Sequence, residues 1–229
     1  MTPLYILLIV GTLGLGLFAS WRVRSAFSRY SKIPAASGLT GAQVARRILQ
    51  AHGIHDVEIV ATEGQLTDHY DPLHKRLALS EPVYGSSSIA AQGVAAHECG
   101  HALQHAVAYA PLQWRMAAVG ITRIASFVPF LVLSIGMFIA PMLSLKVAAI
   151  AFGIIMLFNL VTLPVEFDAS RRAKEILLRM GMVRAGDESA GVNHVLNNAA
   201  LTYVAAFISS LATFLYYLMP LLTGRSDEG

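Results

Sequence analysis

The chain has few charged residues and almost no cysteine. Aspartate, glutamate, lysine and arginine make up 14% of its 229 residues, whereas a soluble globular domain carries about a quarter. Hydrophobic residues reach 55%, so we expect much of the surface to face lipid. The single cysteine, Cys99, excludes an intramolecular disulfide. The net charge of +3 comes without a nucleic-acid-binding motif, which argues against a nucleic-acid partner.

Four apolar stretches without acidic residues or histidine are long enough to cross a bilayer, which takes about 20 helical residues. They cover residues 4–20, 124–140, 147–163 and 199–222. The first lacks a basic N-terminal flank and a small-residue cleavage site, so we interpret it as an uncleaved anchor rather than a signal peptide.

Basic residues are divided unevenly between the two sides of these four stretches. Lys146 and Arg225 lie on one side, and the other 15 of the 17 basic residues lie on the opposite side. Cytoplasmic segments are enriched in lysine and arginine, so we predict that the side with 15 basic residues is cytoplasmic. Both termini are then expected outside.

The polar segment after the first stretch contains His97-Glu98-Cys99-Gly100-His101. Two histidines four residues apart share one helical face and can bind a single zinc ion, Zn²⁺. Glu98 lies on the flank of that face, where a carboxylate can accept a proton from water that zinc has acidified. The alternative is a structural helix, which we disfavour because an unpaired histidine or glutamate among apolar neighbours is costly.

A catalytic zinc normally takes three protein ligands and leaves one position open. Glu166 is our candidate for the third, because two membrane crossings separate it from His101 and return it to the same side. Asp168, about 200° further around a helix, is the alternative ligand. Glu166 could instead be a solvated residue paired with Arg171 or Arg172.

Weaker signals have two interpretations each. His105 lies about 12 Å along the helix from His97, so we interpret it as a neighbouring or surface residue rather than a ligand. The segment 76–79 could be an edge strand on which substrate backbone docks, or simply one arm of a turn. Tyr203 lies with Asn197 and Asn198 near the entry of the fourth stretch, and it could anchor the membrane interface or stabilise an oxyanion, as could His194. Cys99 is interpreted as a packing residue.

Six stretches carry a resemblance to a known family. They are TGAQVARRIL (40–49), TDHYDP (67–72), LSE (79–81), VAAHECGHALQH (94–105), LPVEFDASRR (163–172) and AALTYVAA (199–206). Together they resemble the neutral zinc metallopeptidases of bacterial membranes, the YugP-type family. The resemblance implies peptide hydrolysis on the cytoplasmic side of the bacterial inner membrane, and it points to Glu166 as a ligand.

The sequence is also similar to membrane zinc proteases that place a transmembrane hairpin between the zinc helix and a ligand glutamate. Those enzymes often have an acid four residues after that glutamate, where this chain has Ser170. The serine weakens the analogy for the residue that orients a zinc histidine, but it leaves the expectation for Glu166 unchanged.

We therefore predict a mainly α integral membrane protein with four transmembrane helices and a small cytoplasmic α+β zincin-like domain. The expected segments are a transmembrane helix (1–20), a zinc-peptidase domain (21–123), a transmembrane hairpin (124–163), a cytoplasmic helical segment with the third ligand (164–198), and a transmembrane helix with a short tail (199–229). We also expect a helix that starts at an N-cap on Thr40 and ends just before Gly53, and a long helix capped by Ser86, Ser87 or Ser88 that runs to about Val107. A further helix is expected from Pro164 to about 180, and strands at 57–61, 66–70 and 76–79.

The predicted function is hydrolysis of peptide bonds, with zinc held by His97, His101 and Glu166 and with Glu98 as general base. The expected partners are a peptide or protein substrate and the lipid bilayer. Whether the protein forms a homo-oligomer or has a membrane partner stays open. The alternative is a zinc-binding membrane scaffold without proteolytic activity, which an intact Glu98 argues against.

Overall fold

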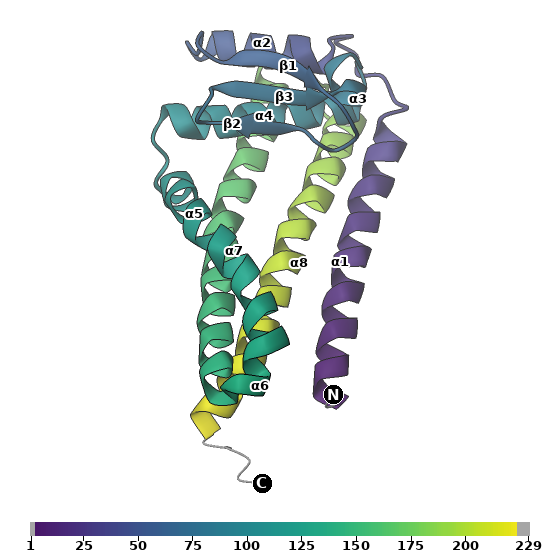
Figure 1. Cartoon of the computed structure of the whole chain (residues 1–229). Coiled ribbons are helices and arrows are strands. Elements are labelled where there is room, and N and C mark those ends of the chain that lie inside the picture. The colour runs from purple at the N-terminus through teal and green to yellow at the C-terminus, as the bar shows by residue number, and fades with distance from the viewer. Residues whose placement is uncertain (1–2, 224–229) are drawn as a thin grey trace. The chain divides into compact units, whose positions relative to one another are not determined.

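The computed structural model describes residues 3–223, and these form two compact units (Figure 1). The apolar unit contains residues 3–18, 114–163 and 203–223, and the polar unit contains residues 19–113 and 164–202. The elements, in chain order, are α1 (Pro3–Tyr30), α2 (Gly41–Ala51), β1 (Glu58–Thr62), β2 (His69–Asp71), β3 (Arg76–Ser80), α3 (Glu81–Tyr84), α4 (Ile89–Ala106), α5 (Ala110–Leu131), the π-helix η1 (Val132–Gly136), α6 (Met137–Ile139), α7 (Pro141–Arg179) and α8 (Asp187–Thr223).

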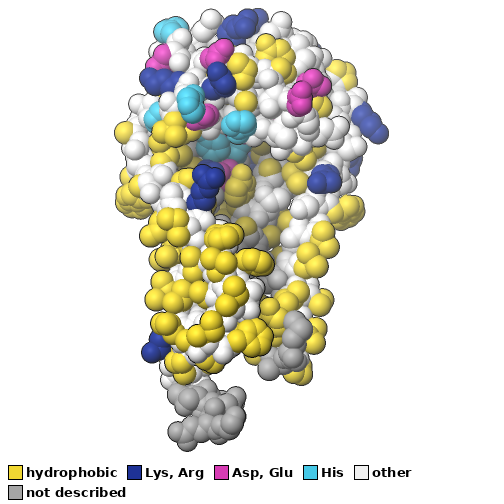
Figure 2. All heavy atoms as spheres, viewed as in Figure 1, with side chains coloured by type: hydrophobic (Ala, Val, Ile, Leu, Met, Phe, Trp, Pro, Cys, Tyr) yellow, Lys and Arg dark blue, Asp and Glu magenta, His cyan; other side chains and the backbone are white. Residues whose placement is uncertain are grey.

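Within the described residues, four helical stretches are long and apolar enough to cross a membrane. They are Pro3–Tyr30, Ala110–Ile139, Pro141–Arg179 and Asp187–Thr223. The predicted mainly α membrane protein with a small sheet is therefore confirmed. Figure 2 shows hydrophobic side chains covering the apolar unit on the face in view. Inside that unit, Asn159 donates a hydrogen bond to Ser210 Oγ at 3.0 Å, which joins α7 to α8.

The long helix α7 runs through Pro164 without interruption, which corrects the expectation that a separate helix begins there. Proline removes one backbone donor, but neighbouring helices often compensate for this loss in membrane helices. The consequence is that Glu166 lies in the middle of one continuous helix rather than in the first turn of a new one. The helix ends at Arg179, close to the predicted position.

The N-terminal ends of α2 and α4 are fixed by side-chain caps. Thr40 accepts a hydrogen bond from the Gln43 amide while the Gln43 side chain accepts one from the Thr40 amide, a complete capping box. Ser88 caps α4 by accepting from the Ala91 amide. Both helices were predicted, and their start positions agree with the sequence signals.

The sheet of the polar unit has the strand order β1-β3-β2. β1 pairs with β3 in parallel, and β2 pairs with β3 in antiparallel orientation. The central position of β3 contradicts the hypothesis that residues 76–79 offer a free edge to substrate, because both sides of this strand are already paired. The second strand is shorter than predicted, since Leu66 adopts a positive φ of 58° in the preceding turn.

The core of the polar unit forms between α2 and α4. Val44, Ala45 and Ile48 from α2 are completely buried, and so is Cys99 from α4. The Cys99 thiol lies 3.7 Å from the Ala45 carbonyl, and burial raises the pKa of this thiol and so favours its neutral form, as expected of a packing residue. This packing fixes one face of α4, and the opposite face carries the candidate site.

Candidate metal centre

Helix α4 presents His97 and His101 on one face, one turn apart. Their ring centroids lie 4.8 Å apart with the rings nearly perpendicular. Both side chains are buried, as is Glu98 between them. Buried imidazoles need polar partners, because an unsatisfied polar group in an apolar interior costs stability.

Helix α7 brings Glu166 to the two histidines. Its Oε2 lies 3.2 Å from His97 Nε2 and 3.5 Å from His101 Nε2. One ligand atom from each of the three residues can be chosen so that all lie within 4.8 Å of one another. The carboxylate is almost completely buried, with 1% of the residue exposed, so it belongs to the interior rather than to a solvated surface.

The close approach of α4 and α7 depends on Gly100. A Cβ atom at this position would lie 2.7 Å from the Ala169 carbonyl oxygen and 3.0 Å from its Cα. Real Cβ atoms do not approach backbone atoms so closely, so only glycine lets the two helices pass at this distance. Gly100 precedes His101 directly and Ala169 is three residues after Glu166, which puts the contact beside the cluster.

The second nitrogen of each imidazole has a partner of its own. Ser170 Oγ lies 3.1 Å from His97 Nδ1, and Gln104 Oε1 lies 3.0 Å from His101 Nδ1. Such partners orient metal-binding histidines and fix which nitrogen is available to the metal. Ser170 lies four residues after Glu166 on α7, and its hydroxyl makes the contact with His97.

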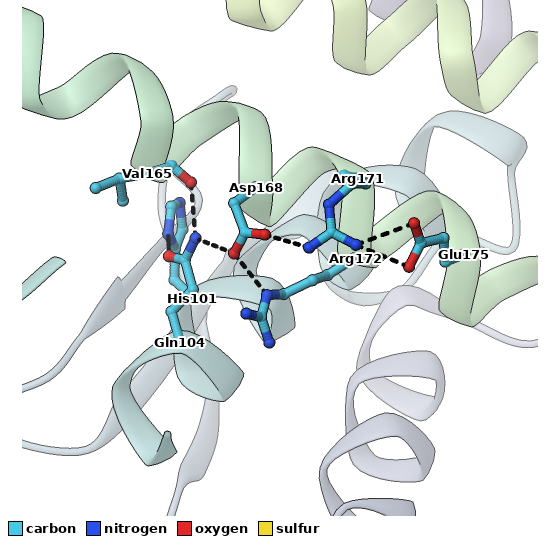
Figure 3. A network of polar contacts seen from close by, with 7 residues as sticks. All are labelled: His101, Gln104, Val165, Asp168, Arg171, Arg172 and Glu175. Carbon is cyan, nitrogen blue, oxygen red and sulfur yellow. Dashed lines mark hydrogen bonds and ion pairs between the residues drawn. The ribbon is translucent and has the colours of Figure 1, made fainter. Parts of the chain in front are cut away.

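Asp168 lies outside the cluster and anchors a polar network instead (Figure 3). Its carboxylate accepts hydrogen bonds from Gln104 Nε2 at 3.0 Å and from Arg172 Nε at 2.6 Å, and it forms an ion pair with Arg171. Arg171 also pairs with Glu175. Arg171 and Arg172 thus pair with Asp168, and Glu166 is almost completely buried at the cluster, which contradicts the interpretation of Glu166 as a solvated residue.

Glu98 is a buried carboxyl group beside the cluster. Burial raises its pKa above the usual value, and the neighbouring imidazoles of His97 and His101 oppose this effect. A carboxyl group whose pKa is raised toward neutrality can both accept and return a proton. This is the electrostatic environment expected of a general base.

Three of the weaker candidates have partners other than the clustered residues. His105 Nδ1 lies 2.9 Å from the Tyr70 hydroxyl and so connects α4 to β2, in agreement with its interpretation as a non-ligand. Asn197 accepts a hydrogen bond from Lys174, and Asn198 accepts one from Arg22. The sequence interpretation missed Gln104, although its position three residues after His101 on the same helix was a usable signal.

A family described as "Putative neutral zinc metallopeptidase" matches residues 5–222. The chain belongs to this family. It is also 46% identical over 225 residues to the "Putative membrane protease YugP" of Bacillus subtilis (strain 168), an alignment that covers 98% of this chain and 100% of the relative. No solved structure matches the chain. The resemblance to the zinc metallopeptidase family that the sequence motifs indicated is thereby confirmed.

The cluster of this family member fits a zinc ion in donor chemistry and in spacing. Two imidazole nitrogens and one carboxylate oxygen are a donor set that catalytic zinc sites use. Donors at about 2.0–2.2 Å from a tetrahedral zinc lie about 3.3–3.6 Å from one another, and the Glu166 oxygen lies 3.2 and 3.5 Å from the two imidazole nitrogens. Two of the three donor–donor distances therefore already match zinc coordination, and all three donor atoms lie within 4.8 Å of one another.

Proposed function

We propose that this membrane protein is a zinc-dependent peptidase that hydrolyses peptide bonds, with His97, His101 and Glu166 as metal ligands and Glu98 as general base. The observation that carries the proposal is the convergence of two buried imidazoles and a buried carboxylate from separate helices, with a further buried carboxyl group beside them. Membership in the zinc metallopeptidase family supports it.

Zinc bound by these residues would supply a Lewis acid that polarises a peptide carbonyl and acidifies water. Glu98 accepts the proton of the attacking water and later returns it to the leaving amine, so that the carboxylate is regenerated. Because burial raises the pKa of Glu98, the protonated form is accessible during the reaction. Ser170 and Gln104 hold the imidazoles in place during these steps.

We assign the site to the cytoplasmic side of the bacterial inner membrane. The support is the distribution of basic residues, of which 15 of 17 lie in the segments that hold the site. The proposed cytoplasmic segments are 21–123 and 164–198. The proposed transmembrane parts are a helix at 1–20, a hairpin at 124–163, and a helix with a short tail at 199–229. The substrates in this proposal are peptides or proteins that reach this face of the membrane.

The test uses the full-length protein purified in detergent, with zinc content measured beside hydrolysis of a peptide library read by mass spectrometry. Glu98→Gln should keep one zinc and lose hydrolysis by about 10²–10⁴-fold, the usual contribution of a proton-transfer group. Glu166→Ala should lose zinc and activity together. Glu175→Gln, on the same helix but outside the cluster, is the matched control and should keep both.

Two results would overturn the proposal in different ways. Activity of Glu98→Gln within about twofold of wild type would remove Glu98 as the base. A wild-type protein that holds zinc but cleaves nothing would support the alternative, a zinc-binding scaffold.

A further inference from the structure

The side chain of Gln104 connects the metal centre to helix α7 (Figure 3). The residue is completely buried. Its Nε2 donates hydrogen bonds to the Val165 carbonyl at 2.8 Å and to Asp168 Oδ2 at 3.0 Å, while its Oε1 faces His101 Nδ1 at 3.0 Å. The amide group of this one residue therefore contacts both the His101 imidazole on α4 and the backbone of α7 next to Glu166.

The orientation of this amide follows from its partners. A backbone carbonyl and a carboxylate can only accept hydrogen bonds, so the NH₂ group of Gln104 must face Val165 and Asp168. The amide oxygen, which can only accept, is then left facing His101. His101 Nδ1 must therefore carry a proton, and in the neutral ring the lone pair is then on Nε2, which faces Glu166.

His97 does not have the same constraint. Its Nδ1 partner is the Ser170 hydroxyl, which can donate or accept and thus permits either tautomer of the ring. The Gln104 contact is also better anchored, because Asp168 is held in turn by Arg171 and Arg172. Gln104 thus fixes the position of the proton on His101 Nδ1, whereas Ser170 leaves the tautomer of His97 open.

We propose that Gln104 is a positioning residue that fixes the His101 ring and its Nδ1-protonated tautomer, and that Asp168 acts through Gln104. The inference rests on the proposed function, in which His101 binds zinc through Nε2. Without Gln104, some molecules have the His101 proton on Nε2 or the His101 ring turned away from the site. In these molecules the proton must move or the ring must turn back before zinc can bind. Zinc affinity is therefore the property that Gln104 should control, separately from the chemistry of Glu98.

The test measures the zinc dissociation constant of the full-length protein by competition with a chelating dye. Gln104→Met keeps the length of the side chain but removes its hydrogen bonds, and it should bind zinc about 10–100-fold more weakly, the usual effect of losing such a partner. Glu175→Gln changes the far, exposed end of the same network and should leave the affinity unchanged. Thermal unfolding of the metal-free proteins checks that each variant folds.

Substitutions of Asp168 test whether this residue acts through Gln104. Asp168→Asn retains an oxygen that can accept from Gln104 Nε2 and should preserve zinc affinity, whereas Asp168→Leu should weaken it. The double variant Gln104→Met/Asp168→Leu should bind zinc no more weakly than Gln104→Met alone. If Asp168 acts only through Gln104, its substitution has no further effect once Gln104 is lost.

The outcomes separate this inference from the proposed function. If wild type binds zinc and Gln104→Met binds it within about threefold, Gln104 is not a positioning residue. If the two single effects simply add in the double variant, Asp168 does not act through Gln104. If the wild-type protein binds no zinc, or if Glu166→Ala binds zinc as tightly as wild type does, the proposed metal site itself is wrong.

Discussion

Gly100→Ala should damage the metal centre without contacting any of its proposed ligands. The added Cβ would lie 2.7 Å from the Ala169 carbonyl oxygen and 3.0 Å from Ala169 Cα. Ordinary contacts are about 3.3 Å or more for carbon to oxygen and about 3.5 Å or more for carbon to carbon. Helices α4 and α7 must therefore separate by about 0.5 Å at this point.

This displacement reaches the cluster because Glu166 is on α7 and the histidines are on α4. Functional sites tolerate about 0.5 Å of misplacement, and metal distances only about 0.2 Å. We expect zinc affinity to fall by about tenfold or more, measured by chelator competition. The metal-free fold should suffer less, because about 1 kcal/mol of helix propensity gained from alanine offsets an overpacking cost of about 1–3 kcal/mol.

Gly93→Ala is the matched control on the same helix. Its Cβ would be 3.5 Å from the nearest atom, Val192 Cγ1, which is an ordinary contact. This variant should keep its zinc affinity and unfold at the same or a higher temperature. The Gly100 contacts are with backbone atoms, so Gly100→Ala/Ala169→Gly should not recover zinc binding. Wild-type affinity in Gly100→Ala would refute the argument from helix separation.

Two further predictions concern the ligands' surroundings and the membrane topology. Ser170→Ala removes the hydroxyl beside His97 and should weaken zinc binding about tenfold; an unchanged dissociation constant would exclude an orienting role for Ser170. In a Cys99→Ala background, Gln65→Cys should be protected from a membrane-impermeant thiol reagent in intact cells, while Ser226→Cys, outside the described residues, should react. The opposite labelling pattern would place the site outside the cell.

Local signals in the sequence were sufficient for the elements of the polar unit that begin with a cap. Thr40 was expected to cap α2, and one of Ser86, Ser87 and Ser88 to cap α4, and the structure has Thr40 and Ser88 as the caps. The spacing of His97 and His101 places them on one face of a helix, so their proximity was also predictable. These features depend on residues within one or two turns of each other.

Features that depend on distant parts of the chain could not be predicted in the same way. The position of β3 between β1 and β2 follows from a parallel pairing that no local pattern specifies. We expected a separate helix to begin at Pro164. The sequence does not show which neighbours compensate for the missing backbone donor of this proline, so it did not reveal that α7 continues through it. Gln104 is visible beside His101, but its contacts with Val165 and Asp168 arise only when α4 and α7 meet.

The order in which the chain is synthesised gives the divided cluster a consequence for its biogenesis. His97 and Glu166 are 69 positions apart, with α5, η1, α6 and the first part of α7 between them. A nascent chain that ends after α4 has two imidazole donors and no carboxylate, and two donors are too few for a stable catalytic zinc site. The proposed peptidase can therefore hold its zinc stably only after the chain has been synthesised past Glu166 and α7 has packed against α4.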